Sequence, residues 1–442
     1  MQTLTVVSSS SPTPRYVSTR GQGGAVSFEQ ALLAGLAPDG GLYVPDRIPP
    51  LDAADWQATD RFSALAGRVL ARWLGAEVPA GVLQDLLDDA FSFPVPLVPL
   101  NGDGWDGVYV LELFHGPTLS FKDFGARTMA RLMAHFLRGR AETVTILVAT
   151  SGDTGSAVAD GFAGQDQIRV VLLYPRGQVS PVQERQLIMA RPGVRAYGVE
   201  GTFDDCQRMV KAAFLDEALA GLRLSSANSI NVGRLLPQML YYVWAVGQGG
   251  FDQVVFCVPS GNLGNLTGGV LAARAGLPVD RFLAAHNTND AFPRFLEGEA
   301  MAFGDSVRTL SNAMDVGAPS NFERLETLLD TGTLRRLVHG DRVSDVETVR
   351  SMRQVYEATG YLADPHTAVG LAVARRYRAK TGDRPPCIVL ATAHPAKFPE
   401  TVAQALGVEP ERPPRLAALW EQPTEMISLA PGIDALREVL IA

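Results

Sequence analysis

The pattern that most constrains this chain begins near residue 101. From there onward, short apolar runs rich in β-branched residues alternate with longer stretches of helical spacing. Short runs of this composition predict strands, and the stretches between them predict helices. Strands that alternate with helices are typical of α/β folds with mainly parallel sheets. We therefore expect open α/β sheets with strands near residues 108–113, 143–149, 168–174, 253–258, 282–286 and 387–393.

The predicted strands fall into two groups. Those within residues 141–224 predict a small domain, and the enclosing segments 101–140 and 225–405 predict a large one. Within the large domain, residues 292–358 are expected to be mostly helix and loop, because their apolar residues do not form short β-branched runs.

The two ends of the chain have other patterns. Residues 16–100 show helical apolar spacing that stops at a cluster of three prolines, so we expect a mainly helical N-terminal domain over 1–100. Residues 1–14, rich in Ser and Pro, are expected to be an irregular lead-in and not a secretory signal. Residues 406–442 are expected to form a C-terminal helical extension.

Composition argues against several classes of function. A chain of 442 residues that is 46% hydrophobic and 19% charged can bury a large core in more than one domain. Its net charge of -8 argues against an extended basic surface for nucleic acid. No apolar run has the length of a membrane span, and the 6 histidines lack metal-motif spacing. The 3 cysteines are far apart, which favours a reducing compartment. We expect a cytoplasmic protein acting on small metabolites, without a metal or an obligate protein partner.

Lysine is scarce in this chain. Of the 39 Lys and Arg residues only 4 are lysine, so arginine supplies almost all the positive charge. Lysine can lose its proton and attack carbon, whereas arginine cannot. Lys122 lies between Phe121 and Phe124, next to Asp123, and these neighbours can exclude water from the amine and supply a local charge. Lys122 is therefore a candidate nucleophile, although the start of an amphipathic helix would also explain the pattern.

A loop rich in glycine and asparagine follows the strand expected at 253–258. Its glycines permit positive φ and close approach, so that backbone amides at a helix N-terminus can surround an anion. The loop lacks the Gly-Lys-Ser/Thr ending of a nucleotide P-loop and the GxGxxG spacing of dinucleotide sites. An ordinary turn at a strand end is the alternative. The candidate phosphate cradle consists of Gly261, Asn262, Leu263, Gly264 and Asn265.

A second loop, at residues 149–156, also follows a predicted strand and precedes a helix. Ser151 and Thr154 offer hydroxyls and Gly152 an amide, which together could hold a carboxylate or a phosphate. Asp153 alone would repel such an anion. Capping of the helix by Ser151 or Asp153 is the alternative.

Three further positions are candidates for the same cleft. Arg234, in a polar segment with Asn231, could bind a phosphate through two N–H groups, or the segment could be a linker into the next helix. Thr392 ends a predicted strand, where ligands of open α/β sheets are usually met, although it could simply bond neighbouring backbone. His115 shortly precedes Lys122.

A candidate nucleophilic amine with a phosphate cradle, in the absence of a nucleotide motif, suggests pyridoxal 5′-phosphate. The chain also resembles the threonine synthase family. The motifs that carry this resemblance occur in the family's order and cover most of the chain, at residues 16–21, 36–45, 112–125, 150–155, 260–265 and 391–398. The resemblance implies the fold-type II architecture, in which a large and a small α/β domain enclose the cofactor beside an added N-terminal domain.

The resemblance also implies roles for the candidate residues. Lys122 would carry the cofactor, and Gly261 to Asn265 would hold its phosphate. Thr392 would face the pyridine nitrogen, and Asp153, where many relatives in the wider fold have asparagine, would lie near the ring hydroxyl. The substrate would be O-phospho-L-homoserine, which reacts with water to give L-threonine and phosphate. Its carboxylate is expected at Ser151, Gly152 and Thr154, and its phosphate at Asn231, Arg234 and either His115 or Ser180.

Other functions stay open at this point. Another fold-type II lyase, such as a serine or threonine dehydratase or a phospho-amino-acid lyase, would stop at elimination. The section around residues 18–21 disfavours this reading, because dehydratases lack it by resemblance. A metabolite-binding protein without catalysis would keep the cradle but need no lysine. A nucleotide-binding dehydrogenase is disfavoured because its fingerprint is missing.

Overall fold

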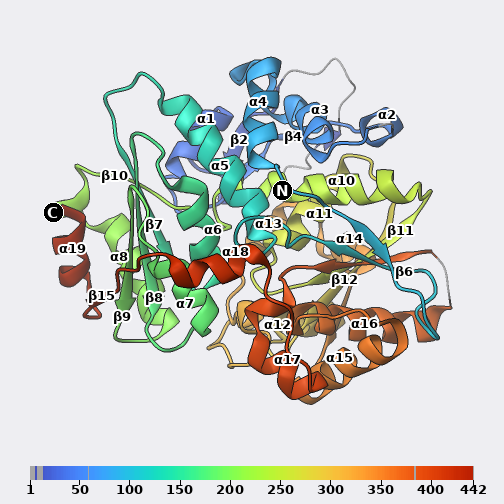
Figure 1. The fold of residues 1–442 in the computed structure, drawn as a ribbon. Helices are drawn as coiled ribbons and strands as arrows, with labels where there is room; N and C mark the ends of the chain where they lie inside the picture. Colours follow the sequence, from blue (N-terminus) through green and yellow to red (C-terminus); the bar gives the residue numbers. More distant parts are fainter. Residues whose placement is uncertain (1–4, 7–12, 58, 383–384, 442) are drawn as a thin grey trace.

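The computed structural model describes residues 5–6, 13–57, 59–382 and 385–441, so most of the lead-in predicted at 1–14 lies outside it. Figure 1 shows the small sheet on the left in green, the large sheet on the right, and the N-terminal helices in blue above them. Residues Thr5–Val6 form β1 and pair in parallel with β4 (Arg47–Ile48).

The large domain is built on a six-stranded sheet in the order β13-β12-β11-β14-β6-β5. All of its pairs are parallel except β5 with β6. The strands are β13 (Val338–Arg342), β12 (Val279–His286), β11 (Val254–Pro259), β14 (Cys387–Ala391), β6 (Val108–Glu112) and β5 (Leu97–Pro99).

Both faces of the large sheet are covered. Phe256 and Val258 of β11 pack into the core that contains α10 (Pro237–Gly249) and α11 (Gly264–Arg274). Val255 and Cys257 pack on the opposite side, with α16 (Pro365–Thr381). Burial on two faces explains why β11 is apolar along its whole length and could be predicted.

Two strands of this sheet were not predicted. β13 lies in the stretch expected to be helix and loop, and its alternation of buried and exposed residues at the sheet edge gives no continuous apolar run. β5 lies inside the predicted N-terminal domain but pairs with β6, so the large domain begins a few residues before residue 101.

The small domain has a five-stranded, wholly parallel sheet in the order β10-β7-β8-β9-β15. Leu147 and Leu173 share a core with Met209 of α8 (Phe203–Leu215) and Leu436 of α19 (Ile433–Ile441). Ile146 on the other face packs with α6 (Asp153–Phe162). The strands are β10 (Arg223–Ser225), β7 (Val144–Ala149), β8 (Ile168–Pro175), β9 (Val194–Val199) and β15 (Ile427–Leu429).

The C-terminal segment differs from its prediction. Residues 406–442 were expected to be helical, but β15 adds an edge strand to the small sheet beside β9. Its three residues, Ile-Ser-Leu, are too few to produce a period in the sequence. The strand exists because β9 offers it unpaired backbone groups.

The N-terminal domain is mainly helical, as predicted. It contains α1 (Phe28–Ala34), α2 (Ala53–Trp56), α3 (Phe62–Leu74) and α4 (Ala80–Ala90), with β2 (Tyr16–Ser18) antiparallel to β3 (Tyr43–Pro45). An aromatic cluster joins this domain to α5 (Lys122–Leu137). Phe124 of α5 is fully buried, with ring centroids 5.3 Å from Phe62 and 5.2 Å from Phe93. Each such pair contributes about 0.5–1.5 kcal/mol, so the cluster fixes the start of α5 firmly.

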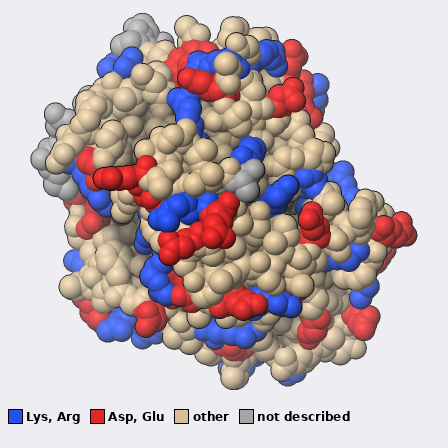
Figure 2. Space-filling model, turned by 90° about the vertical axis from the view of Figure 1, so that its left-hand side faces the viewer, with Lys and Arg blue, Asp and Glu red and all other residues tan. Residues whose placement is uncertain are grey.

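The surface carries charges of both signs (Figure 2). Basic and acidic side chains are interspersed on the face shown in Figure 2. Among the described residues, no helix has both the length and the apolarity needed to cross a bilayer. In the same residues, no three His, Cys, Asp or Glu side chains lie together as a metal site. The three cysteines are free and buried.

Candidate active site

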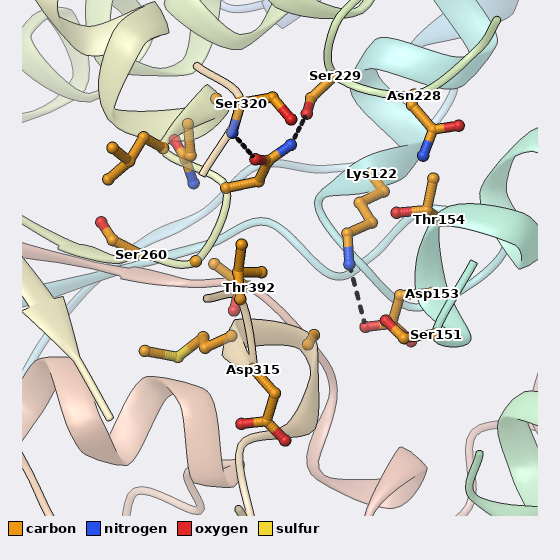
Figure 3. A pocket seen from close by; sticks show the side chains of 18 of the residues that line it. Lys122, Ser151, Asp153, Thr154, Asn228, Ser229, Ser260, Asp315, Ser320 and Thr392 are labelled. Carbon is orange, nitrogen blue, oxygen red and sulfur yellow. Dashed lines mark hydrogen bonds and ion pairs between the residues drawn. The ribbon is translucent and has the colours of Figure 1, made fainter. Parts of the chain in front are cut away.

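A cavity lies at the carboxyl ends of β7, β11 and β14 (Figure 3). The loop after each of these strands contributes to its lining: Ser151 after β7, Ser260 after β11 and Thr392 after β14. The first residue of α5, Lys122, also lines it. Ligands of open α/β sheets are usually met at this edge. The structure thus brings the predicted nucleophile and three of the predicted loops together.

Lys122 is the first residue of α5. The amide of the preceding residue, Phe121, donates to the Thr392 carbonyl at 2.9 Å. The side chain of Lys122 is 14% exposed, and its amine lies 3.8 Å from Asp153 Oδ2 (Figure 3). Burial lowers the pKa of Lys122 to about 8 despite the opposing effect of Asp153. About a tenth of this amine is therefore neutral, and nucleophilic, at pH 7, far more than for an ordinary lysine.

The neighbours in sequence do not all surround the amine as expected. The Phe121 ring does, with its centroid 5.6 Å from the Lys122 amine. Phe124 instead packs in the aromatic cluster, and Asp123 accepts hydrogen bonds from the Thr118 amide at 2.9 Å and hydroxyl at 2.6 Å. Successive helical residues point about 100° apart, so adjacency in sequence does not bring side chains together. The carboxylate beside Lys122 is Asp153.

Asp153 begins α6 and is almost completely buried. Its Oδ1 accepts from Lys397 Nζ at 2.7 Å and from Gln183 Nε2 at 2.9 Å. Burial alone would raise the pKa of Asp153, but Lys397 and Lys122 hold it well below its usual range. Asp153 is therefore an ionised carboxylate, and it does not face the cavity as an unpaired anion.

The cradle loop between β11 and α11 packs closely against neighbouring residues. Positive φ occurs at Leu263, at 59°, and at neither of the two glycines. Gly261 is required by close approach, because a Cβ there would lie 2.9 Å from Met314 Cα. A Cβ on Gly264 would lie 3.2 Å from Ser229 Cβ. Both glycines thus allow the expected close approach, while the positive φ of the loop falls on Leu263.

The cradle can hold a phosphate. Asn265 Oδ1 accepts from the Tyr241 hydroxyl at 2.7 Å and the Tyr242 hydroxyl at 2.8 Å, which fixes the orientation of the amide. Asn265 Nδ2 is buried at the cavity, with no hydrogen-bond partner among the described residues. An unpartnered buried donor is costly unless a ligand satisfies it. Asn262 is held from both sides, by Ser229 Oγ at 2.7 Å and the Ser320 amide at 2.5 Å.

The second loop is only partly open to a ligand. Ser151 and Thr154 line the cavity, and Figure 3 shows them on the side of Lys122 and Asp153. The Gly152 amide already donates to Thr150 Oγ1 at 3.0 Å, and Gly152 is not among the lining residues of the described chain. The hydroxyls, and not the Gly152 amide, are therefore the groups offered to a carboxylate.

Arg234, on α9 (Val232–Leu235), lines the cavity as predicted. Its Nη1 donates to the Ala227 carbonyl, and its buried Nε has no hydrogen-bond partner among the described residues. Burial lowers the pKa of Arg234 to about 10, so the guanidinium stays charged at neutral pH. Its charge makes it a group that can bind a second anion in this cavity.

Three other predicted phosphate ligands do not line the cavity within the described chain. Asn231 is fully buried, and its side chain bonds Leu32 O at 2.9 Å, Ser226 O at 3.0 Å and the Gly233 amide at 2.9 Å. It caps α9 and thereby positions Arg234. The remaining two are bonded elsewhere, His115 to Glu112 at 2.7 Å and Ser180 as the cap of α7 (Pro181–Ile188). The geometry corrects the expectation that these three contact a ligand.

One wall of the cavity had no sequence signal. Met314 and Asp315 lie between α12 (Ala291–Glu297) and α13 (Phe322–Leu328), at the end of the short 3-10 helix Asn312–Met314. The Ala313 amide in this segment donates to His366 Nε2 at 3.1 Å, and His366 Nδ1 contacts Asp364 at 2.6 Å. No motif or periodicity marks these residues. Lys397, by contrast, is predicted near the cleft from the sequence, because it is one of only 4 lysines and follows Thr392, although the sequence assigns it no chemistry.

Family models match almost the whole chain. The model described as pyridoxal-phosphate dependent enzyme matches residues 91–393. The models described as threonine synthase N terminus and threonine synthase, C-terminal match residues 15–91 and 367–440. The curated threonine synthases of Serratia marcescens and Escherichia coli are 43% and 42% identical to this chain. Each alignment covers 94% of this chain and 96% of the relative.

Solved structures agree with these matches. A structure of threonine synthase from Brucella melitensis with bound PLP has a TM-score of 0.89 at 38% identity, covering 97% of this chain and 99% of that one. Threonine synthase from Escherichia coli has a TM-score of 0.88 at 39% identity, with the same coverage. An aspartate racemase at a TM-score of 0.53 and 14% identity shares the fold alone.

Proposed function

The chain belongs to the threonine synthase family, and we propose that it converts O-phospho-L-homoserine and water to L-threonine and phosphate at the Lys122 cavity. Its fold is the fold-type II architecture and its cofactor is pyridoxal 5′-phosphate. One observation supports the proposal above the others. A single cavity holds the Lys122 amine, a phosphate cradle and Arg234, and within the described part of the chain Asn265 Nδ2 and Arg234 Nε have no hydrogen-bond partner. A phosphorylated substrate needs a cation separate from the cofactor's cradle.

Pyridoxal phosphate, when bound, supplies an aldehyde for an amine and takes up the electrons left when a bond at Cα breaks. Lys122 provides the amine that holds the cofactor. The loop from Gly261 to Asn265 provides amides at the N-terminus of α11 and the Asn265 side-chain donor for its phosphate. The Thr392 hydroxyl is assigned to the ring nitrogen, and a neutral hydroxyl there cannot stabilise a protonated pyridine as a carboxylate would. Asp153 is assigned to the vicinity of the ring hydroxyl.

Lys122 would act a second time once its amine is free. That amine would accept the proton of the substrate Cα, release it, and then accept one from Cβ as phosphate leaves from Cγ. It would pass the Cβ proton to Cγ, which becomes the methyl group of the product. A base with a pKa of about 8 is suited to this exchange near neutral pH. Arg234 binds the substrate phosphate, and the Ser151 and Thr154 hydroxyls bind its carboxylate. Water would then add its hydroxyl at Cβ, its other proton would balance the charge of the released phosphate, and Lys122 would return a proton to Cα.

We also infer that the protein works in the cytoplasm. The inference is supported by its three cysteines, which are free and buried, as is usual in a reducing compartment.

The test is an assay of the full-length protein with O-phospho-L-homoserine, measuring threonine and phosphate together. We expect equal amounts of both products, and loss of both in Lys122→Ala. Lys380→Ala, at an exposed position of α16, is the matched control and keeps full activity. Borohydride treatment of the loaded enzyme should attach the cofactor to the peptide that contains Lys122. Formation of 2-oxobutyrate without threonine would identify an elimination-only lyase and contradict the proposal.

A further inference from the structure

Lys397 has no role in the proposed function, yet it is completely buried. It lies in the short 3-10 helix Pro395–Lys397, which follows β14 and Thr392. Its ammonium donates to the Thr118 carbonyl at 2.9 Å and to Asp153 Oδ1 at 2.7 Å. Burying an ammonium carries a large desolvation penalty even when it is paired. In a chain with only 4 lysines, such a residue calls for a functional reason.

Two amines share the Asp153 carboxylate. Lys397 is 2.7 Å from Oδ1, which is a direct charge-assisted hydrogen bond. Lys122 is 3.8 Å from Oδ2, which is beyond hydrogen-bond distance. Gln183 occupies Oδ1 as well, at 2.9 Å. Asp153 is therefore bound firmly by Lys397 and attracts Lys122 only at longer range.

The charges around these groups act in known directions. Lys122 faces Asp153, which raises its pKa, and Lys397 and Arg234, which lower it, in addition to burial. Lys397 faces Asp153 and, more weakly, Asp123 and His394. Asp153 and Lys397 come from different domains, since Asp153 begins α6 in the small domain and Lys397 follows β14 in the large one.

We propose that Lys397 is a positioning residue for Lys122. By binding Asp153 directly, it prevents that carboxylate from closing on Lys122, and its own charge disfavours a second ammonium nearby. Lys122 is thereby kept partly unprotonated and free to capture an aldehyde. The inference rests on the proposed role of Lys122, but not on the identity of the substrate.

The test measures the protonation of Lys122 without any turnover. Pyridoxal phosphate is removed from the full-length protein and added back, and the rate of the visible absorbance change is followed against pH. Only the neutral amine attacks the aldehyde, so the midpoint of the profile reports Lys122. The midpoint of the wild-type profile is expected near pH 8. Lys397→Met is expected to move the midpoint upward, and each pH unit of that shift slows capture near pH 7 about tenfold.

Three companion variants separate charge from packing. Lys397→Arg keeps the charge and is expected to keep the midpoint. Asp153→Asn removes the attracting carboxylate and is expected to move the midpoint downward. Lys380→Met, exposed on α16, is the matched control with no shift. The pH dependence of acylation of the Lys122 peptide, followed by mass spectrometry, gives a second reading that does not involve the cofactor.

A purely structural role for Lys397 would leave these midpoints unchanged. A folded Lys397→Met protein with the wild-type midpoint overturns the proposal. If that variant does not fold, the double variant Asp153→Asn with Lys397→Met leaves no unpaired charge from this pair. Its midpoint must lie above that of Asp153→Asn alone, because the repulsion from Lys397 is gone, and equal midpoints overturn the proposal. Failure to form threonine in wild type would count against the proposed function and not against this inference.

Discussion

Gly261 is the position where one methyl group should do most damage to cofactor binding. An added Cβ would lie 2.9 Å from Met314 Cα, and 3.2 Å from both Ala313 O and Val316 Cγ2. Optimal carbon contacts lie at about 3.5–4.0 Å. Two of the three atoms belong to backbone, so no rotamer change can relieve the overlap.

The size of the effect follows from the packing. Gly261 does not have positive φ, so Gly261→Ala adds no backbone strain and its whole cost is steric. Overpacking a closely packed site costs about 1–3 kcal/mol. The cradle loop and the segment at Met314 both line the cavity. Because the two must move apart to make room for the added methyl group, the phosphate site is distorted. If the same free energy is lost from cofactor binding, the Kd of pyridoxal phosphate rises about 5- to 150-fold.

The assay is a titration of cofactor-free protein with pyridoxal phosphate, followed by absorbance. Gly81→Ala is the matched control, because Gly81 lies exposed in α4 with open space around its Cβ and without positive φ. It is expected to bind the cofactor as wild type does and to gain up to about 1 kcal/mol in helix stability. A Gly261→Ala protein with wild-type affinity for pyridoxal phosphate would refute the steric reasoning.

Three further outcomes are expected. Arg324→Met leaves the carbonyls of Tyr43 and Ser229 without the guanidinium that now donates to them at 3.1 and 2.8 Å, so the free energy of unfolding in urea should fall by about 3 kcal/mol or more. Arg234→Met should raise KM for the phosphorylated substrate about 10- to 100-fold, while the Kd of pyridoxal phosphate stays within about twofold of wild type. The lowered pKa of Asp153 adds stability that is complete well above its unfolded pKa of about 3.9 and is lost as pH falls towards the folded value. Urea unfolding should therefore show the deficit of Asp153→Asn shrinking below about pH 4.

Local features of the site could be predicted from the sequence. Ser151 and Thr392 follow apolar strands buried on both faces, and the carboxyl ends of parallel strands meet at one edge. Lys122 was marked by its scarce residue type. These inferences needed only the spacing of apolar residues and the residue types, both of which can be read from short segments of the sequence.

Contacts between the domains could not be predicted in the same way. Lys397 and Asp153 lie on separate elements, and their 2.7 Å contact depends on how the large and small domains dock. Asn231 failed as a predicted ligand because a polar side chain near a cavity can equally cap a helix, and only burial distinguishes the two. β15 depends on a free edge of β9, which no local pattern reveals.

The charges of the cavity explain why a lysine-poor chain keeps two lysines there. Arg234 and Lys397 are buried cations, and Lys122 adds most of a third positive charge, against the carboxylates of Asp153 and Asp315 among the described residues. Burial raises the pKa of Asp315 to about 6, which leaves it largely ionised at pH 7. The excess of positive charge suits a cofactor phosphate and a substrate with its own phosphate and carboxylate. Lys397 supplies its share of that excess as a compact ammonium, which makes a short contact to Asp153 beside Gln183. The compact ammonium therefore leaves room for the one amine in the cavity that must change its protonation.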